Sequence, residues 1–496
     1  MATDCSEQLT FWDLGKQQVT VDFAGGRVVS DAGLLALRLL DRELGVLAEV
    51  ARRLPDPRAQ ALVTHSREAL LTQEVYQILA GYPDGNDAQA LREDPLMQTL
   101  VGVCPEEGQT LASGSTLNRF HHAYTRRDAE LPLEERPVLG EVDAALTQRL
   151  RILNDYLPEL FVRTRGQAPR YVVLDLDPSD DPTHGQQVLT FFHGYYDQYQ
   201  YFPLFAFDGE SGFPLAAWLR PGTVAAGCGA VSTLQSMVAS LRTAWPEVLI
   251  IVRGDCGLAS PEMYEYCEEN GLLYAFGYSG NSVLLDRTAH TLADLETYYA
   301  FYGRTEPAVQ RFEVLEDYRA ESWSRPRRIV AKVEINRHGT NRRFVVTNLS
   351  GDPRGLYEGF YVQRGAVPEK PLGELKHGLQ MDRLSFHRFR ANSFKLLEHV
   401  LAYALVVLHR EATAAIPEVA RAEVSTLRQR LWKVGAVVQV SVRRIWFHFS
   451  ESWPQRALFV RVYEAIQAFV ARLAAPALAA SSETPVLPVA SSLLLS

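Results

Sequence analysis

The sequence predicts an α/β protein whose β-sheet core is interrupted by a β-rich insertion and flanked by mainly helical regions. Three observations predict this class. Leucines recur at three- and four-residue steps early in the chain, apolar runs ending in acids begin at Tyr171, and strand-like alternation fills 311–349. With 496 residues and 47% apolar side chains, the chain is long enough for two or three domains.

The amino-terminal third shows helical periodicity. Leu34, Leu37, Leu70 and Leu71 belong to apolar sets spaced by three or four residues, and turn residues at 81–85 divide the predicted helices. We therefore predict a mainly helical domain over 1–165.

From Tyr171 the pattern changes to strands. Apolar or aromatic runs at 171–177, 188–196, 201–207 and 214–219 precede a predicted helix at 231–245 and an apolar strand at 248–252. Meandering strands, a helix and a strand that returns beside the first are the order of a ribonuclease-H-like core. In that order the first and fourth strands are neighbours. Asp177 and Asp255, which follow these two strands, should then lie close together.

The predicted domains follow from these patterns. The ribonuclease-H-like core occupies 166–300 and 356–415, with the β-rich insertion at 301–355 between its two parts. A carboxy-terminal region at 416–475 is predicted to be helical. The Ala-, Ser-, Pro- and Leu-rich tail at 476–496 is expected to be disordered.

Charge limits the possible partners. The chain has 50 basic and 59 acidic side chains, a formal net charge of −9, so a polyanion must meet local basic patches. The strongest patch, 319–343, has eight basic residues and two acids, and further clusters begin at Lys376 and Arg421. Solvated faces of helices and strands are the alternative explanation.

Cysteine usage and hydropathy indicate an intracellular protein. The five cysteines form no Cys-x-x-Cys pair, so neither a zinc ribbon nor a disulfide framework is indicated, and a reducing cytoplasm is expected. No signal-peptide pattern opens the sequence. The best apolar run, 400–408, is too short to cross a membrane and predicts a buried helix.

Three acids are candidate catalytic residues. Asp175 and Asp177 share one face of their strand, whereas Asp180 and Asp181 fall in a loop between prolines, where turn capping or solvation is expected. Asp255 follows the second strand, and Ser260 already serves as the cap of the next helix. With Glu369 as a third acid, a sheet and a helix can hold two divalent cations and so cut phosphodiesters.

Several motifs resemble those of a known family. Several segments, together with the set Tyr361, Arg364, Glu369 and Lys376, resemble bacterial insertion-sequence transposases that carry an Asp-Asp-Glu triad. These segments are 81–87, 91–95, 111–120, 174–186, 253–257, 382–385 and 389–392. The match is closest to the insertion sequence 1380 family, within the superfamily founded on insertion sequence 4. The likeness spans about residues 10 to 450.

The resemblance implies roles for individual residues. Asp177, Asp255 and Glu369 would hold two Mg²⁺ ions, for which Mn²⁺ can substitute. Tyr361, Arg364 and Lys376 would grip phosphates at the transposon end. On the insertion, Trp323 would stack on a base flipped from the cut end, beside Arg327 and Arg328; a core tryptophan is the alternative.

The third acid departs from the family spacing. The superfamily places three residues between the arginine and the glutamate, whereas this chain has four between Arg364 and Glu369, with Pro368 beside the acid. One extra residue breaks a shared helical face unless a bulge absorbs it. Glu374 is therefore the fallback for the third acid, and Asp175 the fallback for the first.

The resemblance implies a cut-and-paste DNA transposase. It would bind terminal inverted repeats of double-stranded DNA through the helical domain 1–165, with the region 416–475 contacting DNA or a second subunit. It would cleave at the transposon ends by two-metal hydrolysis, with hairpin ends as intermediates, and join the 3′-hydroxyls to target DNA. A homodimer in the synaptic complex, a cytoplasmic, nucleoid-associated location and no membrane association are expected. The alternatives are a metal-dependent nuclease without strand transfer and an inactive, domesticated DNA-binding protein.

Overall fold

The computed structural model describes residues 8–106, 108–123, 144–302, 308–366 and 369–475. The chain divides into two compact units. The helical unit comprises Met1–Arg126, Gly378–Gln380 and Leu408–Arg472, and the sheet unit comprises Arg127–His377, Met381–Val407 and Leu473–Ser496. The predicted disordered tail, 476–496, lies outside the described residues.

The helical unit is built around a buried helix. Leu70, Val75 and Ile78 of α3 are fully buried, and the helix begins where the Ser66 hydroxyl accepts a hydrogen bond from the Ala69 N–H. The described helices of this unit are α1 (Leu34–Leu44), α2 (Val46–Arg53), α3 (Arg67–Ala80), α4 (Asp87–Leu91), α5 (Pro95–Val101), α6 (Gly114–His121), α15 (Pro417–Ala420), α16 (Val424–Leu427) and α17 (Arg456–Ala474). Short helical turns lie at Gln60–Leu62 and Arg428–Trp432.

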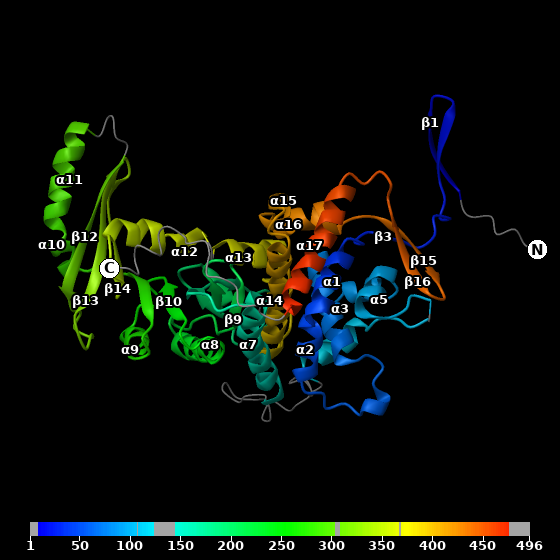
Figure 1. Cartoon of the computed structure of the whole chain (residues 1–496), viewed down its shortest axis with the longest axis horizontal. Helices are drawn as coiled ribbons and strands as arrows, with labels where there is room; N and C mark the ends of the chain where they lie inside the picture. Colours follow the sequence, from blue (N-terminus) through cyan, green and yellow to red (C-terminus); the bar gives the residue numbers. More distant parts are fainter. Residues whose placement is uncertain (1–7, 107, 124–143, 303–307, 367–368, 476–496) are drawn as a thin grey trace, which may run out of the picture. The chain divides into compact units, whose positions relative to one another are not determined.

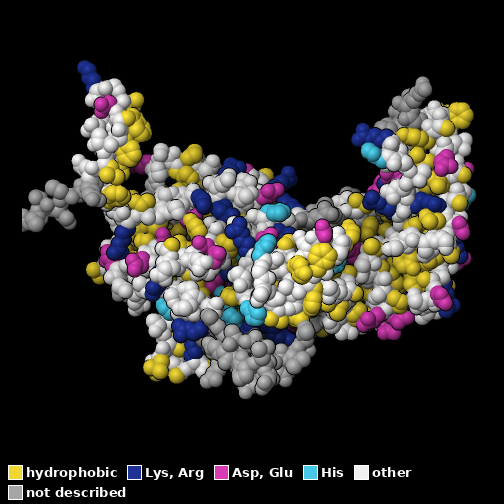
Figure 2. All heavy atoms as spheres, turned by 180° about the vertical axis from the view of Figure 1, so that it is seen from behind, with side chains coloured by type: hydrophobic (Ala, Val, Ile, Leu, Met, Phe, Trp, Pro, Cys, Tyr) yellow, Lys and Arg dark blue, Asp and Glu magenta, His cyan; other side chains and the backbone are white. Residues whose placement is uncertain are grey.

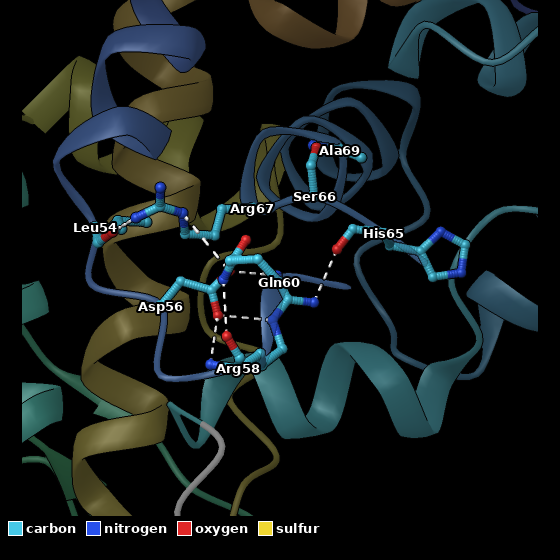
Figure 3. Close-up of polar contacts among 8 residues, drawn as sticks. All are labelled: Leu54, Asp56, Arg58, Gln60, His65, Ser66, Arg67 and Ala69. Atoms are coloured by element: carbon cyan, nitrogen blue, oxygen red, sulfur yellow. Dashed lines mark hydrogen bonds and ion pairs between the residues drawn. The ribbon is translucent and has the colours of Figure 1, made fainter. Parts of the chain in front are cut away.

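The connection between α2 and α3 is fixed by one carboxylate (Figure 3). Arg58 donates from Nε to Asp56 Oδ1 and from Nη2 to Asp56 Oδ2, both at 2.8 Å. Arg67 Nε lies 3.8 Å from Asp56 Oδ2. These hydrogen bonds lower the pKa of Asp56 to about 2. The loop is therefore held by a local ion-pair network before α3 begins.

Strands are also present in the helical unit. A two-stranded hairpin, β1 (Leu9–Leu14) and β2 (Gln17–Val21), exposes Phe11, Trp12 and Leu14, and Figure 2 shows hydrophobic surface along it. A small sheet has the order β16-β15-β3, formed by β16 (Arg444–Phe449), β15 (Ala436–Ser441) and β3 (Val28–Val29). The region 416–475, expected to be helical, therefore contains a hairpin, because Val437 and Val438 alternate between exposed and buried faces.

The sheet unit contains an eight-stranded sheet with the order β12-β13-β14-β11-β10-β4-β8-β9 (Figure 1). Its strands are β4 (Tyr171–Pro178), β8 (Leu204–Asp208), β9 (Pro214–Trp218), β10 (Leu249–Gly254), β11 (Leu273–Tyr278), β12 (Ala308–Tyr318), β13 (Arg327–Asn336) and β14 (Gly339–Thr347). Strand β10 runs parallel to β4, whereas β8 runs antiparallel to it on the other side. The expectation that the first and fourth core strands are neighbours is confirmed.

One predicted strand of the core lies elsewhere. The prediction that 188–196 is a core strand is wrong, because β8 and β9 supply the meander. Residues of that segment instead join a small sheet of order β5-β7-β6, made of β5 (Asp181–Pro182), β7 (Gln198–Tyr201) and β6 (Phe191–His193). Phe192 and Tyr199 pair on this sheet and are exposed, so its aromatic residues do not indicate a core position.

The strands of the insertion extend the main sheet. Strand β14 pairs antiparallel with β11, and β13 and β12 follow outward. Val309, Val333 and Ile335 pack with Leu295 of α11, and Figure 1 shows that helix beside β12–β14. The alternation of apolar and polar residues in the insertion arises because α11 covers one face of its strands. Pairing of β14 with β11 joins the insertion to the core sheet.

Helices complete the sheet unit. They are α7 (Ala144–Arg165), α8 (Ala230–Ala244), α9 (Pro261–Glu269), α10 (Ser282–Arg287), α11 (Ala289–Tyr302), α12 (Gln363–Ala366), α13 (Glu369–Gly373) and α14 (Phe389–Ala412), with π-helical turns at Gly355–Tyr361 and Glu374–Gly378. Helix α7, placed in the amino-terminal domain by the sequence analysis, packs against α8 and β9. By length and composition α14 could cross a membrane, but its apolar window is entirely buried, as in the core helix of a folded domain.

A buried ion pair joins the two central strands. Arg253 of β10 lies opposite Asp175 of β4, and its Nε and Nη2 donate to the carboxylate oxygens at 2.6 and 2.7 Å. The side chains are 4% and 0% exposed, and Arg253 Nη1 also donates to the Phe360 carbonyl at 2.7 Å. This bidentate pair fixes the register of β4 and β10 and ties both strands to the segment before α12.

Replacing Asp175 with alanine should destabilise the sheet unit by about 3–5 kcal/mol, because Arg253 would be left buried without its carboxylate. Chemical unfolding of the purified protein measures this. Asp294→Ala is the matched control, since its bridge to Arg311 joins side chains that are 64% and 52% exposed and is worth about 1 kcal/mol or less. Equal effects of the two substitutions would contradict a structural role for Asp175.

Candidate active site

Two acids meet at the carboxyl ends of the central parallel strands. The paired register runs to Gly254 opposite Leu176, so the next positions are Asp255 and Asp177. A Cβ on Gly254 would lie 2.7 Å from the Leu258 side chain, so any larger residue before Asp255 would force its neighbours to shift. Side chains that follow neighbouring parallel strands gather at one edge of the sheet, which is where sites form in such sheets. The sequence expectation that Asp177 and Asp255 lie close together agrees with this register.

The two carboxylates interact electrostatically. The pKa of Asp177 is raised to about 6: burial is the main cause, the Arg364 guanidinium opposes it, and the Asp255 charge adds to it. Asp255 Oδ1 accepts a hydrogen bond from the Gly257 N–H at 3.0 Å, which orients its carboxylate in the turn after β10. Two hard oxygen donors with an excess of negative charge suit a divalent cation.

Cationic side chains pair with the acids on this edge. Arg364 of α12 donates from Nη1 to Asp177 Oδ1 at 3.1 Å, and Lys376 Nζ lies 2.7 Å from Asp180 Oδ1. The Arg364 guanidinium lies 6.0 Å from the Tyr361 ring, and a Cβ on Gly277 would come within 2.5 Å of the Tyr361 hydroxyl. The structure therefore brings Tyr361 and Arg364 to the acid pair, and Lys376 to the loop that follows Asp177.

The third acid is placed only in part. Glu369 is the first residue of α13, and its side chain lies outside the described residues. The fallback acid Glu374 is buried in the following π-helical turn, where the Tyr403 hydroxyl donates to its Oε2 at 3.0 Å. Asp175, the other fallback, is held by Arg253. Both fallback acids thus have structural partners.

A family model identifies the chain. The model described as "Transposase DDE domain group 1" matches residues 11–471. The chain belongs to this family. No curated protein matches it. A solved structure to which it is similar is a cryo-EM structure of piggyBac transposase in a synaptic complex with hairpin DNA, with 12% identity, a TM-score of 0.41, and coverage of 91% of this chain and 84% of that chain.

In this DDE transposase the tryptophan expected to stack on DNA is a core residue. Trp323 is 3% exposed, and its ring contacts those of Tyr264, Tyr278 and Tyr318 at centroid distances of 5.4, 5.3 and 5.4 Å. A ring enclosed in this way has no free face for a base. The structure therefore supports the alternative, a core tryptophan, and corrects the assignment of Trp323 to DNA.

The adjacent arginines are also occupied within the protein. Arg327 is buried and donates from Nε and Nη2 to the two oxygens of Glu268, both at 2.8 Å. Arg328 donates to the Leu349 and Gly351 carbonyls at 2.8 and 2.9 Å. These contacts stabilise the insertion, so neither arginine is available to DNA in this structure, contrary to the sequence expectation.

One charged residue near the acids was missed by the sequence analysis. Arg220, which follows β9, is buried. It donates from Nε to the Phe202 carbonyl and from Nη1 to the Ala226 and Cys228 carbonyls, each at 2.7 Å. Burial lowers its pKa to about 10, and the Asp255 charge opposes this shift. The only local signal is an arginine directly after an apolar strand, which does not distinguish it from a solvated residue.

The raised pKa of Asp177 predicts a pH-dependent stability difference. Between about pH 4 and 6 the folded protein holds a proton on Asp177 that the unfolded chain releases, so stability falls as pH rises through this window. Asp177→Asn removes the carboxyl group that binds this proton. In EDTA, the stability of this variant relative to the parent should increase by up to roughly 3 kcal/mol between pH 4 and 7, as measured by urea unfolding. The same change at the exposed Asp286 is the control, and parallel pH profiles for parent and Asp177→Asn would contradict the prediction.

The burial of Trp323 predicts a stability effect. Trp323→Ala should cost about 3–5 kcal/mol in unfolding free energy, because it removes a large ring from an aromatic core. Trp446→Ala, on a side chain that is 46% exposed, is the matched control and should have little effect. Unchanged stability with weaker binding to a cut DNA end would restore the stacking role.

Proposed function

We propose that this chain is the transposase of a bacterial insertion sequence of the insertion sequence 1380 type, within the insertion sequence 4 superfamily. It cleaves at the ends of its element by divalent-metal-dependent hydrolysis and joins the 3′-hydroxyls to target DNA. The observation that carries this proposal is the meeting of Asp177 and Asp255 at the ends of β4 and β10, with Arg364 beside them.

The acid residues would hold the metal. Asp177, Asp255 and Glu369 offer the carboxylates, and Mg²⁺, or Mn²⁺ in its place, suits them because it prefers oxygen ligands and keeps open water positions. Two bound ions would activate the attacking oxygen and stabilise the leaving oxygen of the phosphodiester. Deprotonated Asp177 is required for this role, so the charge of Arg364 helps by favouring the carboxylate form.

Arg364 and Lys376 would hold the DNA backbone. A guanidinium can donate two hydrogen bonds to one phosphate, and a lysine supplies a point charge. In the described structure these groups donate to Asp177 and Asp180 at 3.1 and 2.7 Å. A phosphate at this edge would exchange with the carboxylates as their partner, while Tyr361 stays packed against β11 and limits the movement of Arg364.

The partners follow from the same proposal. The helical unit, and the basic residues from Lys376 and Arg421 onward, would bind terminal inverted repeats of double-stranded DNA by neutralising phosphates. Both ends would be held by a homodimer, with hairpin ends as intermediates. The reaction would take place at the bacterial nucleoid.

Alanine at Asp177, Asp255 or Glu369 should reduce Mg²⁺-dependent nicking of an end-sequence duplex by about a thousandfold, since metal-assisted charge stabilisation is worth several kcal/mol. Binding of the same duplex, measured by gel shift, should be nearly unchanged. Glu374→Ala is the control for Glu369→Ala and tests which glutamate is the third acid. A protein that nicks DNA at wild-type rate after Asp255→Ala would exclude this site.

The reaction products distinguish a transposase from the two alternative functions, a nuclease and a DNA-binding protein. Joined strands in the presence of target DNA support a transposase, whereas cleavage without joining supports a nuclease. End binding with no metal-dependent nicking, unaffected by Asp255→Ala, supports a domesticated DNA-binding protein, which the altered spacing before Glu369 would explain.

A further inference from the structure

A second carboxylate cluster lies beyond the acid pair and contains a fully buried aspartate. Asp181 of β5 is 0% exposed, and neither of its carboxylate oxygens has a hydrogen-bond partner among the residues that the structure describes. The sequence analysis assigned Asp181 to a solvated loop. That expectation is wrong, because pairing of Asp181 with Tyr201 of β7 places it inside the small sheet.

An unpartnered carboxylate of this kind is unfavourable. An ionised side chain removed from water without a compensating charge or hydrogen bonds loses several kcal/mol. Protonation removes the charge but leaves both oxygens without partners, so it compensates only in part. A bound group that supplies positive charge and directly contacts the oxygens would compensate fully.

The charges around Asp181 indicate what kind of bound group its carboxylate would accept. Burial raises the pKa of Asp181 well above its ordinary value, Asp382 and Asp180 raise it further, and Lys376 opposes them. The ammonium of Lys376 is already committed to Asp180, at 2.7 Å. With all four groups ionised, three carboxylates and one ammonium would carry an excess of two negative charges, which is the charge that one divalent cation neutralises.

Backbone and side-chain contacts hold the two halves of this cluster together. Gln187 Nε2 donates to the Leu384 carbonyl at 2.8 Å, and the Val188 N–H donates to the His387 carbonyl at 3.0 Å. Asn392 at the start of α14 donates to Gln187 Oε1 at 2.9 Å. The segment that carries Asp382 is therefore fastened to the segment that follows Asp181.

We propose that Asp181 and Asp382 bind a divalent cation at a site separate from the Asp177–Asp255 pair. Two carboxylates, completed by carbonyl and water oxygens, are an ordinary ligand set for Ca²⁺ or Mg²⁺. The cation would cross-link β5, directly after the strand of Asp177, to the segment that leads into α14. Its role is structural, and the proposal does not depend on DNA cleavage.

Calcium binding to the full chain tests the site. In the Asp177→Asn/Asp255→Asn background, which removes two of the three carboxylates proposed to hold the catalytic metal, equilibrium dialysis against Ca²⁺ with elemental analysis should still find about one ion per chain. Adding Asp181→Asn or Asp382→Asn should remove that ion. Calcium should also raise the melting temperature of the background protein, and neither added variant should show this rise.

The substitutions are chosen to keep the fold. Asparagine has nearly the size of aspartate, and Asp382 is only partly buried, so Asp382→Asn remains informative if Asp181→Asn does not fold. Asp294→Asn, at an exposed bridge, is the control and should retain the ion.

Three results would overturn the site. The first is that the Asp177→Asn/Asp255→Asn protein binds no calcium. The second is that it binds the same amount of calcium after Asp181→Asn or Asp382→Asn is added. The third is that calcium does not change its melting temperature. In the first case, a higher melting temperature of Asp181→Asn in EDTA would identify a protonated carboxyl or an ordered water in place of the cation. Failure of the nicking assay would leave these outcomes unchanged, so the two proposals are tested separately.

Discussion

The parallel pairing of β4 with β10 is the constraint on which the candidate site depends. One register places Arg253 opposite Asp175 inside the sheet and brings Asp177 and Asp255 together where the strands end. A slip by one residue would turn the side chains of a strand to the other face and would break both arrangements. The buried bidentate pair makes such a slip costly, because either charge alone would be left without compensation. Asp175 thus holds the two strands together, whereas Asp177, on the same face of β4, is the proposed metal ligand.

The site concentrates negative charge that the fold balances only in part. Asp177 and Asp255 repel each other, and Arg364 offsets this repulsion from a short helix outside the sheet. Beyond them, Lys376 pairs with Asp180, and the buried carboxylate of Asp181 has no hydrogen-bond partner among the described residues. A protein stabilised only for folding would replace such groups with apolar ones, since unpaired buried charge is unfavourable. Their presence fits a sheet edge arranged to receive cations, as functional sites commonly trade stability for binding.

Local patterns predicted the part of the fold that depends on them. Continuous apolar runs identified β4 and β10, and the order of elements along the chain was sufficient to predict that they are neighbours. The same patterns could not show that Trp323 faces Tyr264 and Tyr318, because burial of an aromatic side chain depends on residues far away in the sequence. Asp181 was misassigned for the same reason: flanking prolines indicate a loop, but Asp181 pairs with Tyr201 of β7 and is buried. The partners of Arg364 and Lys376 lie 187 and 196 residues away and have no local signal.

The positive groups at the site therefore have two sets of partners. In this structure Arg364 and Lys376 donate to Asp177 and Asp180. If they bind phosphate, as proposed, each must release a carboxylate, and Asp177 then becomes free to bind metal. When Arg364 leaves, the Asp177–Asp255 pair carries more uncompensated negative charge, and a cation can replace the guanidinium as the group that favours the carboxylate form of Asp177. DNA and metal would thus favour each other's binding through one exchange of partners, and the π-helical turns on both sides of α12 and α13 lie where the chain would accommodate that movement.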